Sequence, residues 1–195
     1  NYQVPREFPV DEWLQFTGGI REQTFDTYDT FSARVGASQT KRRFQGIKEN
    51  HFIAISRDDF EIGNETGIGR FLIPGVNWSK RSVDNELYPQ RGFAVEFEVR
   101  GAADAVLSDT NFITGVIHAQ YIQALPLEFR SFIRTDLGGM WVDEFRTLPP
   151  SQRFFAGGDK SIRGYDFQDL GPINSSGNVI GGRYLGIVSF ELEKY

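Results

Sequence analysis

Apolar and polar residues alternate with a period of two along most of this chain. The alternation is clearest between Gly92 and Arg100, where phenylalanine and valine at residues 93, 95, 97 and 99 alternate with Glu96, Glu98 and Arg100. This period places successive side chains on opposite sides of a β-strand and predicts one apolar face. The pattern predicts about eight strands, at residues 12–24, 30–43, 51–61, 69–81, 91–101, 111–124, 127–141 and 182–194. Their lengths are close to the roughly 9–11 residues that a transmembrane β-strand needs.

Charged residues recur on the polar face of nearly every predicted strand. In residues 127–137, for example, Glu128, Arg130 and Arg134 alternate with apolar neighbours. Such residues are typical of the wet interior of a barrel whose apolar residues face lipid, whereas a soluble sandwich more often exposes lysine, serine and threonine. The pattern therefore favours an all-β fold, an antiparallel transmembrane β-barrel present as a fragment, over a water-soluble antiparallel sheet.

The composition excludes several classes of function. The 195 residues include 21 basic and 26 acidic side chains, a net charge of -5 that does not supply the basic face required to bind nucleic acid. The chain has no cysteine, which excludes disulfide scaffolds, thiolate zinc sites and thiol nucleophiles. No segment approaches the roughly 18 consecutive apolar residues of a spanning helix. The net charge therefore argues against a nucleic-acid partner, and the short apolar segments argue against a membrane-spanning helix.

Residues 145–181 interrupt the alternation. The segment is rich in glycine, proline, arginine and aspartate, and connections of this length are usually functional or disordered. Its aromatic residues Phe154, Phe155, Tyr165 and Phe167 predict packing against another surface and hence order. The sequence therefore predicts a long, ordered loop that folds inward and has no sheet partners of its own.

Two blocks of residues carry a resemblance to a known family. Residues 148–165 read Leu-Pro-Pro-Ser-Gln-Arg-Phe-Phe-Ala-Gly-Gly-Asp-Lys-Ser-Ile-Arg-Gly-Tyr, and residues 181–192 begin with a glycine pair and end in Ser-Phe-Glu-Leu. In this order and spacing, they resemble the sixth extracellular loop and the next strand of the BamA/TamA outer-membrane insertase superfamily, the bacterial surface antigen family. The Phe-Phe-Ala-Gly-Gly-Asp form is most similar to the TamA type. Residues 88–93 are a weaker third match.

The resemblance implies a functional loop and a partner for its arginine. The loop motif comprises Gly157, Gly158, Asp159, Ile162, Arg163, Gly164 and Tyr165. The family places this arginine against inward acidic residues of the strands that follow. Glu191 matches the first of these, its strand parity also puts it on the polar face, and Glu193 shares that parity as the runner-up. A second acidic partner is expected beyond the end of this sequence.

The resemblance also implies a function and a location. The intact protein is expected in the bacterial outer membrane, among its lipids, where it inserts and folds unfolded outer-membrane clients such as autotransporters by strand templating. A TamB-like inner-membrane partner would bind through POTRA domains. Those domains and the terminal barrel strands are expected to be absent from this chain, which resembles an excised middle of the barrel without insertase activity.

Other interpretations remain open at this point. A two-partner secretion pore or a passive porin shares the barrel, and a soluble domain could bind a lipid or a sugar with Glu96 and Glu98. Enzymatic patterns are weak, because His51 and His118 lie on different predicted strands and Ser161 lacks a nucleophile elbow. We expect no enzyme activity, no metal and no cofactor.

Tryptophan and tyrosine fall near the predicted strand ends. Side chains of this kind form interfacial girdles in membrane barrels, although packing at strand ends is an alternative. The candidates are Trp13, Trp78, Trp141, Tyr2, Tyr28, Tyr88 and Tyr195.

Overall fold

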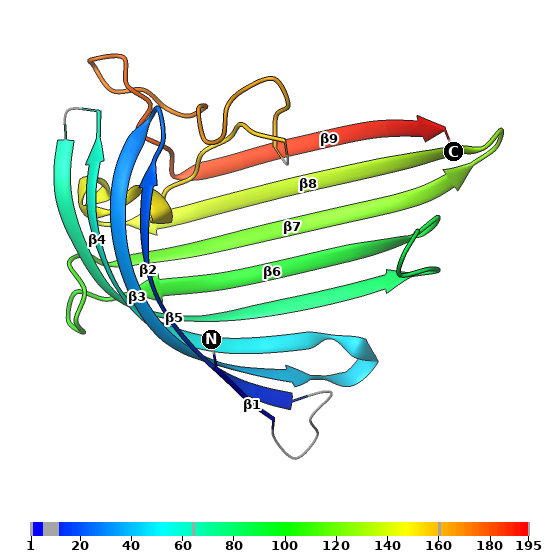
Figure 1. Ribbon diagram of the computed structural model, residues 1–195, viewed down its shortest axis with the longest axis horizontal. Coiled ribbons are helices and arrows are strands. Elements are labelled where there is room, and N and C mark those ends of the chain that lie inside the picture. The colour runs from blue at the N-terminus through cyan, green and yellow to red at the C-terminus, as the bar shows by residue number, and fades with distance from the viewer. Residues whose placement is uncertain (1, 6–11, 64, 160, 195) are drawn as a thin grey trace.

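The structure, a computed structural model, describes residues 2–5, 12–63, 65–159 and 161–194 and is all-β (Figure 1). The strands are β1 (Tyr2–Pro5), β2 (Glu12–Thr24), β3 (Tyr28–Arg42), β4 (Lys48–Ile62), β5 (Glu65–Val83), β6 (Gly92–Ala102), β7 (Phe112–Leu125), β8 (Phe129–Val142) and β9 (Tyr184–Lys194). Three single-turn 3₁₀ helices accompany them, namely η1 (Phe44–Gly46), η2 (Phe145–Thr147) and η3 (Pro150–Gln152). No helix in the described ranges is long and apolar enough to cross a membrane.

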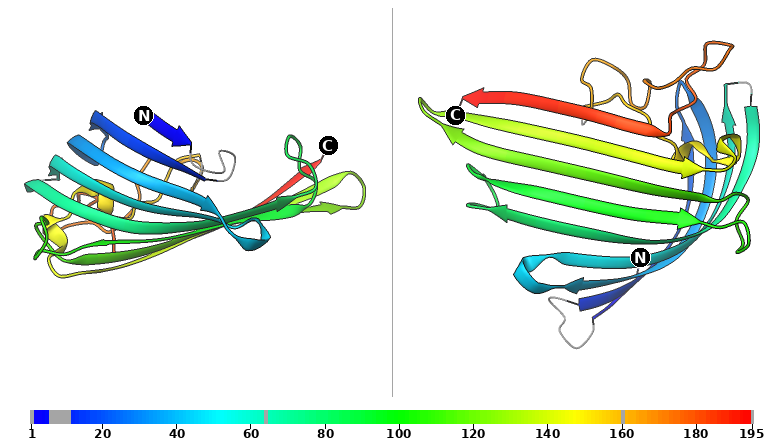
Figure 2. Two further views of the ribbon diagram at one scale, coloured as in Figure 1. Left: turned by 90° about the horizontal axis from the view of Figure 1, so that it is seen from below. Right: turned by 180° about the vertical axis from the view of Figure 1, so that it is seen from behind.

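All nine described strands form one antiparallel sheet in chain order, from β1 to β9. Each strand pairs with the next one along the chain, so the sheet is a continuous meander. It curls around a concave face, as the two views of Figure 2 show, and β1 and β9 form its two edges. The predicted fold class, a fragment of an antiparallel β-barrel, is confirmed, and the sheet is not closed.

The register separates a polar concave face from an apolar convex face. Asn77 opposes Glu98 on the concave side, while the next pair along, Trp78 and Phe97, stacks on the convex side. Glu96, Glu98, Arg130, Arg134 and Glu191 share the concave side by the same parity, and Phe93, Phe97, Phe129 and Phe190 lie opposite. Apolar side chains are exposed on the convex face, as expected where a barrel wall meets lipid.

The predicted strand ranges overlap eight of the observed strands, and β1 was missed. β1 has only four residues, too few for a period of two to stand out, and its place comes from pairing with Trp13–Phe16 of β2. β5 begins at Glu65 rather than at residue 69, because Glu65 pairs with Ile62 across the tight turn at Gly63. Because glycines at residues 63 and 67 favour a turn, the sequence pattern did not show that residues 65–68 belong to the strand.

The concave face changes from polar to apolar toward the end that carries the long loop. One core cluster there contains Phe71, Ile73, Phe112, Met140, Val142, Leu148 and Phe154. A second contains Tyr28, Phe60, Ile62 and Phe155. Residues of the wall and of the loop bury each other in both clusters. Apolar residues therefore occur on both faces of β4 and β5, with Ile73 buried on the concave side and Ile55 exposed on the convex side.

The aromatic-girdle prediction is wrong for Tyr28. Tyr28 is only 6% exposed and packs on the concave side beside Phe155, with ring centroids 5.6 Å apart. Trp141 lies on the convex side and is 59% exposed, in keeping with an interfacial position. Tyr195 lies outside the described residues. Strand ends next to the loop therefore supply core residues as well as interfacial ones.

Candidate functional site

The long loop between β8 and β9 lies over the concave face of the sheet (Figure 2). We call residues 145–156 and 170–182 the loop base and residues 157–169 the loop tip. The prediction that the loop has no sheet partners is wrong in detail. Isolated antiparallel bridges join Phe154 to Gly182 and Ala156 to Leu170, so the two limbs of the base pair with each other.

Apolar side chains seat the loop base on the sheet. Leu148 is fully buried and Phe154 is 9% exposed, and both belong to the cluster that includes Phe71 and Phe112. Phe155, the next residue, packs in the other direction with Tyr28. Successive phenylalanines in an extended segment point to opposite sides, so each one enters a different cluster. The predicted order of this segment thus has a physical basis in burial.

A buried arginine, Arg153, ties the base together. Its side chain is 5% exposed, and its guanidinium donates to three main-chain carbonyl oxygens, those of Leu148 at 2.8 Å, Ile180 at 3.0 Å and Arg146 at 3.2 Å. Burial lowers the pKa of Arg153 to about 10, while the charge of Glu65 opposes that shift. The group therefore remains a cation at neutral pH.

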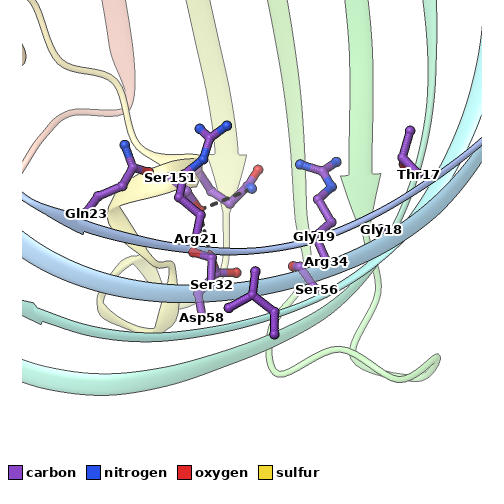
Figure 3. Close-up of a pocket in the computed structure, with 12 residues that line it drawn as sticks. Thr17, Gly18, Gly19, Arg21, Gln23, Ser32, Arg34, Ser56, Asp58 and Ser151 are labelled. Atoms are coloured by element: carbon purple, nitrogen blue, oxygen red, sulfur yellow. Dashed lines mark hydrogen bonds between the residues drawn. The ribbon is translucent and has the colours of Figure 1, made fainter. Parts of the chain in front are cut away.

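A polar pocket of about 350 Å³ lies between the loop base and strands β2 to β4 (Figure 3). Its buried carboxylate, Asp58, accepts hydrogen bonds from Ser32 Oγ at 2.6 Å and from Ser151 Oγ at 3.4 Å. Ser151 belongs to η3, so this contact connects the loop to the wall at β4. Arg21 and Arg34 line the same pocket and extend from β2 and β3.

The loop tip folds as a compact turn around its glycines. The Gly158 amide donates to the Tyr165 carbonyl at 3.0 Å, and the Gly157 amide donates to Ser161 Oγ at 3.1 Å. Gly157 has φ +111°, and a Cβ at this position would lie 2.3 Å from the Asp166 carbonyl oxygen. Glycine is therefore required there by both the backbone conformation and the close approach.

The tip places Arg163 on the lumen wall. Arg163 Nη2 lies 3.2 Å from both carboxylate oxygens of Glu191 in β9. Arg134 of β8 also donates to Glu191 Oε1. One carboxylate thus accepts from a loop arginine and a wall arginine, and the Arg163–Glu191 contact expected from the sequence is present. The Arg163 side chain is 66% exposed, so water screens its part of the interaction.

The alternative partner, Glu193, is used by another arginine. Glu193 Oε2 accepts from Arg130 Nη2 at 2.5 Å, and the Arg130 side chain is 5% exposed. Arg130 also donates to the Pro89 carbonyl oxygen and lies over the Tyr88 ring at 4.2 Å. Parity correctly put Glu193 on the concave face, but pairing with β8 places it opposite Arg130 and away from the loop.

The remaining motif residues surround the tip. Asp159 lines a cavity of about 610 Å³ between the loop and the wall, together with Gly157, Gly158 and Tyr165. His118 and Asp136 lie on its wall side, with Nδ1 and Oδ1 2.6 Å apart. Ile162 and Tyr165 are 38% and 53% exposed. No group of three or more potential metal ligands occurs within the described residues.

Sequence reasoning missed Arg153 and Asp58. Arg153 stands in an irregular segment, and its partners are main-chain carbonyls, which carry no residue-type signal. Asp58 follows a strand pattern, but its burial depends on a loop that lies far away in the chain. The one signal in the sequence was that Arg153 immediately precedes two phenylalanines. A charge buried among apolar residues needs hydrogen-bond partners, so this position indicates a bonded arginine.

Comparison with known proteins agrees with this architecture. A family model described as the Omp85 superfamily domain matches residues 14–193. The chain belongs to the Omp85 superfamily. It is also similar to the outer membrane protein assembly factor BamA of Nitratidesulfovibrio vulgaris, with 27% identity over 117 residues. That alignment covers 60% of this chain and 15% of the relative, so the chain spans a small part of the length of that protein.

Membership in the Omp85 superfamily favours an outer-membrane barrel over a soluble ligand-binding domain. It confirms the superfamily expected from the sequence and identifies the chain as an outer-membrane protein. The exposed apolar residues of the convex face are therefore lipid-facing. A soluble domain that binds a sugar or lipid through Glu96 and Glu98 does not fit this location.

Proposed function

We propose that this chain is part of an outer-membrane assembly factor that inserts and folds β-barrel proteins by strand templating. A client strand would pair with an exposed strand edge of the intact barrel and extend its sheet. The observation that carries the proposal is the contact of Arg163 in the loop tip with Glu191, which also accepts from Arg134, inside an Omp85 sheet. Outer-membrane lipids and unfolded client proteins are the partners that this activity requires.

We further propose that the intact protein is of the TamA type. The support is the Phe-Phe-Ala-Gly-Gly-Asp form at residues 154–159, followed by Ser-Ile-Arg-Gly-Tyr at residues 161–165. Under this proposal the clients include autotransporters. A TamB-like inner-membrane protein would bind through POTRA domains of the intact protein.

The proposed activity involves no covalent chemistry. The acidic residues that could serve as a catalytic pair have other contacts, since Glu98 accepts from Arg100 at 2.8 Å and Glu96 accepts from Asn77 at 2.6 Å. His51 and His118 each contact one carboxylate, that of Glu49 and that of Asp136. These contacts support roles in wall structure, and we propose that the protein is not an enzyme.

Reconstitution of the intact protein into liposomes tests this function. An unfolded autotransporter barrel is added, and its folding is followed by the shift in gel mobility of folded barrels and by protease protection. We expect the parent to accelerate client folding and Arg163→Ala to reduce that acceleration. Arg70→Ala is the matched control, because the Arg70 side chain is also 66% exposed and its Nε lies 3.7 Å from Asp109 Oδ2, outside the loop.

Two results would contradict the proposal. One is client folding that is no faster with the parent protein than with empty liposomes. The other is steady ion conductance, or secretion of a client across the bilayer, without any client inserted into it, which would favour a passive porin or a two-partner secretion pore.

A further inference from the structure

The loop base contains a buried cation, Arg153, that is stabilised by main-chain dipoles and aromatic rings, with the charge of Glu65 acting on it without a direct ion pair. Among the described residues, Arg153 forms no ion pair, and its guanidinium carbon lies 4.8 Å from the Phe145 ring centroid and 5.8 Å from that of Phe60. Aromatic faces and main-chain carbonyl oxygens both attract a cation. Arg153 is thus solvated by the protein itself.

The three carbonyl oxygens that bind Arg153 come from both limbs of the loop base. Arg146 and Leu148 precede the tip in the chain, whereas Ile180 follows it. A planar guanidinium holds its donors in a fixed fork, so it fixes the spacing of the limbs as well as holding them together. Arg153 therefore acts as a clip across the entrance and exit of the loop.

Main-chain hydrogen bonds continue from the clip to the tip. Phe154 and Gly182 exchange amide and carbonyl bonds at 3.0 and 2.7 Å. Ala156 and Leu170 do the same at 2.8 and 2.9 Å. The next residue, Gly157, begins the turn that presents Arg163. These two isolated bridges, with residues 171–181 looped out between their partners, form an interrupted ribbon that connects the buried arginine to the motif that meets Glu191.

We propose that Arg153 is the positioning residue of this loop, the group that sets where Arg163 meets the wall carboxylate of Glu191. The hydrogen bonds of Arg153 go to the loop base and not to Glu191, so it acts through the ribbon that it clips. The inference rests on the proposed function of the tip for its effect on client folding. Its effect on the position of the tip is independent of that function.

A lysine cannot replace Arg153 in this role. An ammonium group is a compact point charge, and it cannot reproduce the planar fork that donates to carbonyls of both limbs. The proposal therefore predicts that Arg153→Lys and Arg153→Ala both displace the tip. A role that needed positive charge alone would be satisfied by lysine.

Distance measurements by double electron–electron resonance test the position of the tip. The intact protein carries spin labels at Ile162→Cys in the tip and Leu87→Cys in the β5–β6 turn, with no other cysteine in this chain. Leu87 is 97% exposed and Ile162 is 38% exposed, so both sites accept a label. We expect a narrow distance distribution in the parent and in Arg70→Ala, whose side chain lies outside the loop, and one about twofold wider in Arg153→Ala and Arg153→Lys.

Client folding by the same variants separates this inference from the proposed function. Both Arg153 variants should fold clients about tenfold more slowly, which corresponds to about 1.4 kcal/mol, while gel mobility shows the barrel itself folded. A wider distribution with unchanged client folding leaves the positioning role intact and overturns the proposed function of the tip. A parent-like distribution in Arg153→Lys overturns the positioning role, even if Arg153→Ala does not fold.

Discussion

The base and the tip of the long loop each depend on an arginine, and the two arginines act in opposite environments. Arg153 in the base is 5% exposed and donates to three carbonyl oxygens. Arg163 in the tip has a side chain that is 66% exposed, and it meets one carboxylate that it shares with Arg134. The buried arginine contributes to where the loop lies, whereas the exposed arginine contributes little to stability and remains accessible for interaction.

This contrast separates structural arginines from interacting ones on physical grounds. A buried hydrogen-bonding network is expensive to break, because each group left without a partner is away from water. An exposed ion pair in a wet lumen is screened, and water replaces either partner at small cost. The predictions below test this difference from the largest expected effect to the smallest.

The largest effect is expected from Leu148→Ala in the loop base. Leu148 is fully buried in the cluster with Phe71 and Phe154, so truncation leaves a cavity and should cost about 2–5 kcal/mol. Denaturant unfolding of the intact protein in detergent measures this change. Leu87→Ala is the control, since Leu87 is 97% exposed. Equal losses in the two variants would show that the base is not packed as described.

Next in size is Gly157→Ala at the junction of base and tip. The new Cβ would meet the Asp166 carbonyl oxygen at 2.3 Å, and φ +111° is unfavourable for alanine. Strain of this kind costs about 1–3 kcal/mol, and we expect faster proteolysis of the loop while the strands stay protected.

Gly164→Ala is the matched comparison for that variant. Gly164 has φ +93° but nothing within 4 Å of an added Cβ, so only backbone strain of about 1–2 kcal/mol applies. Its loop should be cleaved more slowly than that of Gly157→Ala. The reverse order would contradict the close approach of the tip to Asp166.

A smaller change in stability is expected from Arg163→Ala. Because the side chain is mostly exposed, we expect a loss below about 1 kcal/mol, together with easier proteolysis of the tip. A double-mutant cycle of Arg163→Ala with Glu191→Gln measures the coupling between the two side chains. Additive effects on tip proteolysis would show that this contact does not hold the tip.

The smallest effect is an acid-dependent loosening of the β5–β6 turn. The Asp84 carboxylate accepts from the amides of Arg91, Gln90 and Asn85, and these hydrogen bonds, that from Arg91 first, hold its pKa below the usual range. A lowered folded-state pKa means that the stabilisation is complete above the unfolded pKa of about 3.9 and is lost as pH falls through the folded value.

Hydrogen exchange of the turn amides at decreasing pH measures this loss. We expect protection at residues 85–91 to fall on acidification, after correction for the intrinsic pH dependence of exchange, and this fall to be absent in Asp84→Asn. The amides of Phe154 and Gly182 in the loop base should show no such fall, because they bind main-chain carbonyl oxygens, which do not titrate. An equal loss of protection at these two amides and in the turn would contradict the view that carbonyl oxygens, which do not titrate, hold the base together.

The sequence by itself determined eight of the nine described strands and the faces of their side chains, because the period of two places each side chain before any tertiary contact forms. Parity alone put Glu191 on the concave face, and the family resemblance then predicted its contact with Arg163. The same parity could not distinguish Glu191 from Glu193, since both point inward. Pairing of β8 with β9 decided which acid faces the loop arginine and which faces Arg130.

Only the tertiary structure decided how the loop is held. Arg153 binds main-chain carbonyls, and every residue carries one, so no pattern of residue types marks its partners. Tyr28 and Asp58 belong to strands by their periodicity, yet they are buried because a loop from the other end of the chain covers them. Local periodicity specifies which face a side chain occupies, whereas burial depends on the segment that lies over that face, and such distant segments meet only in the folded chain.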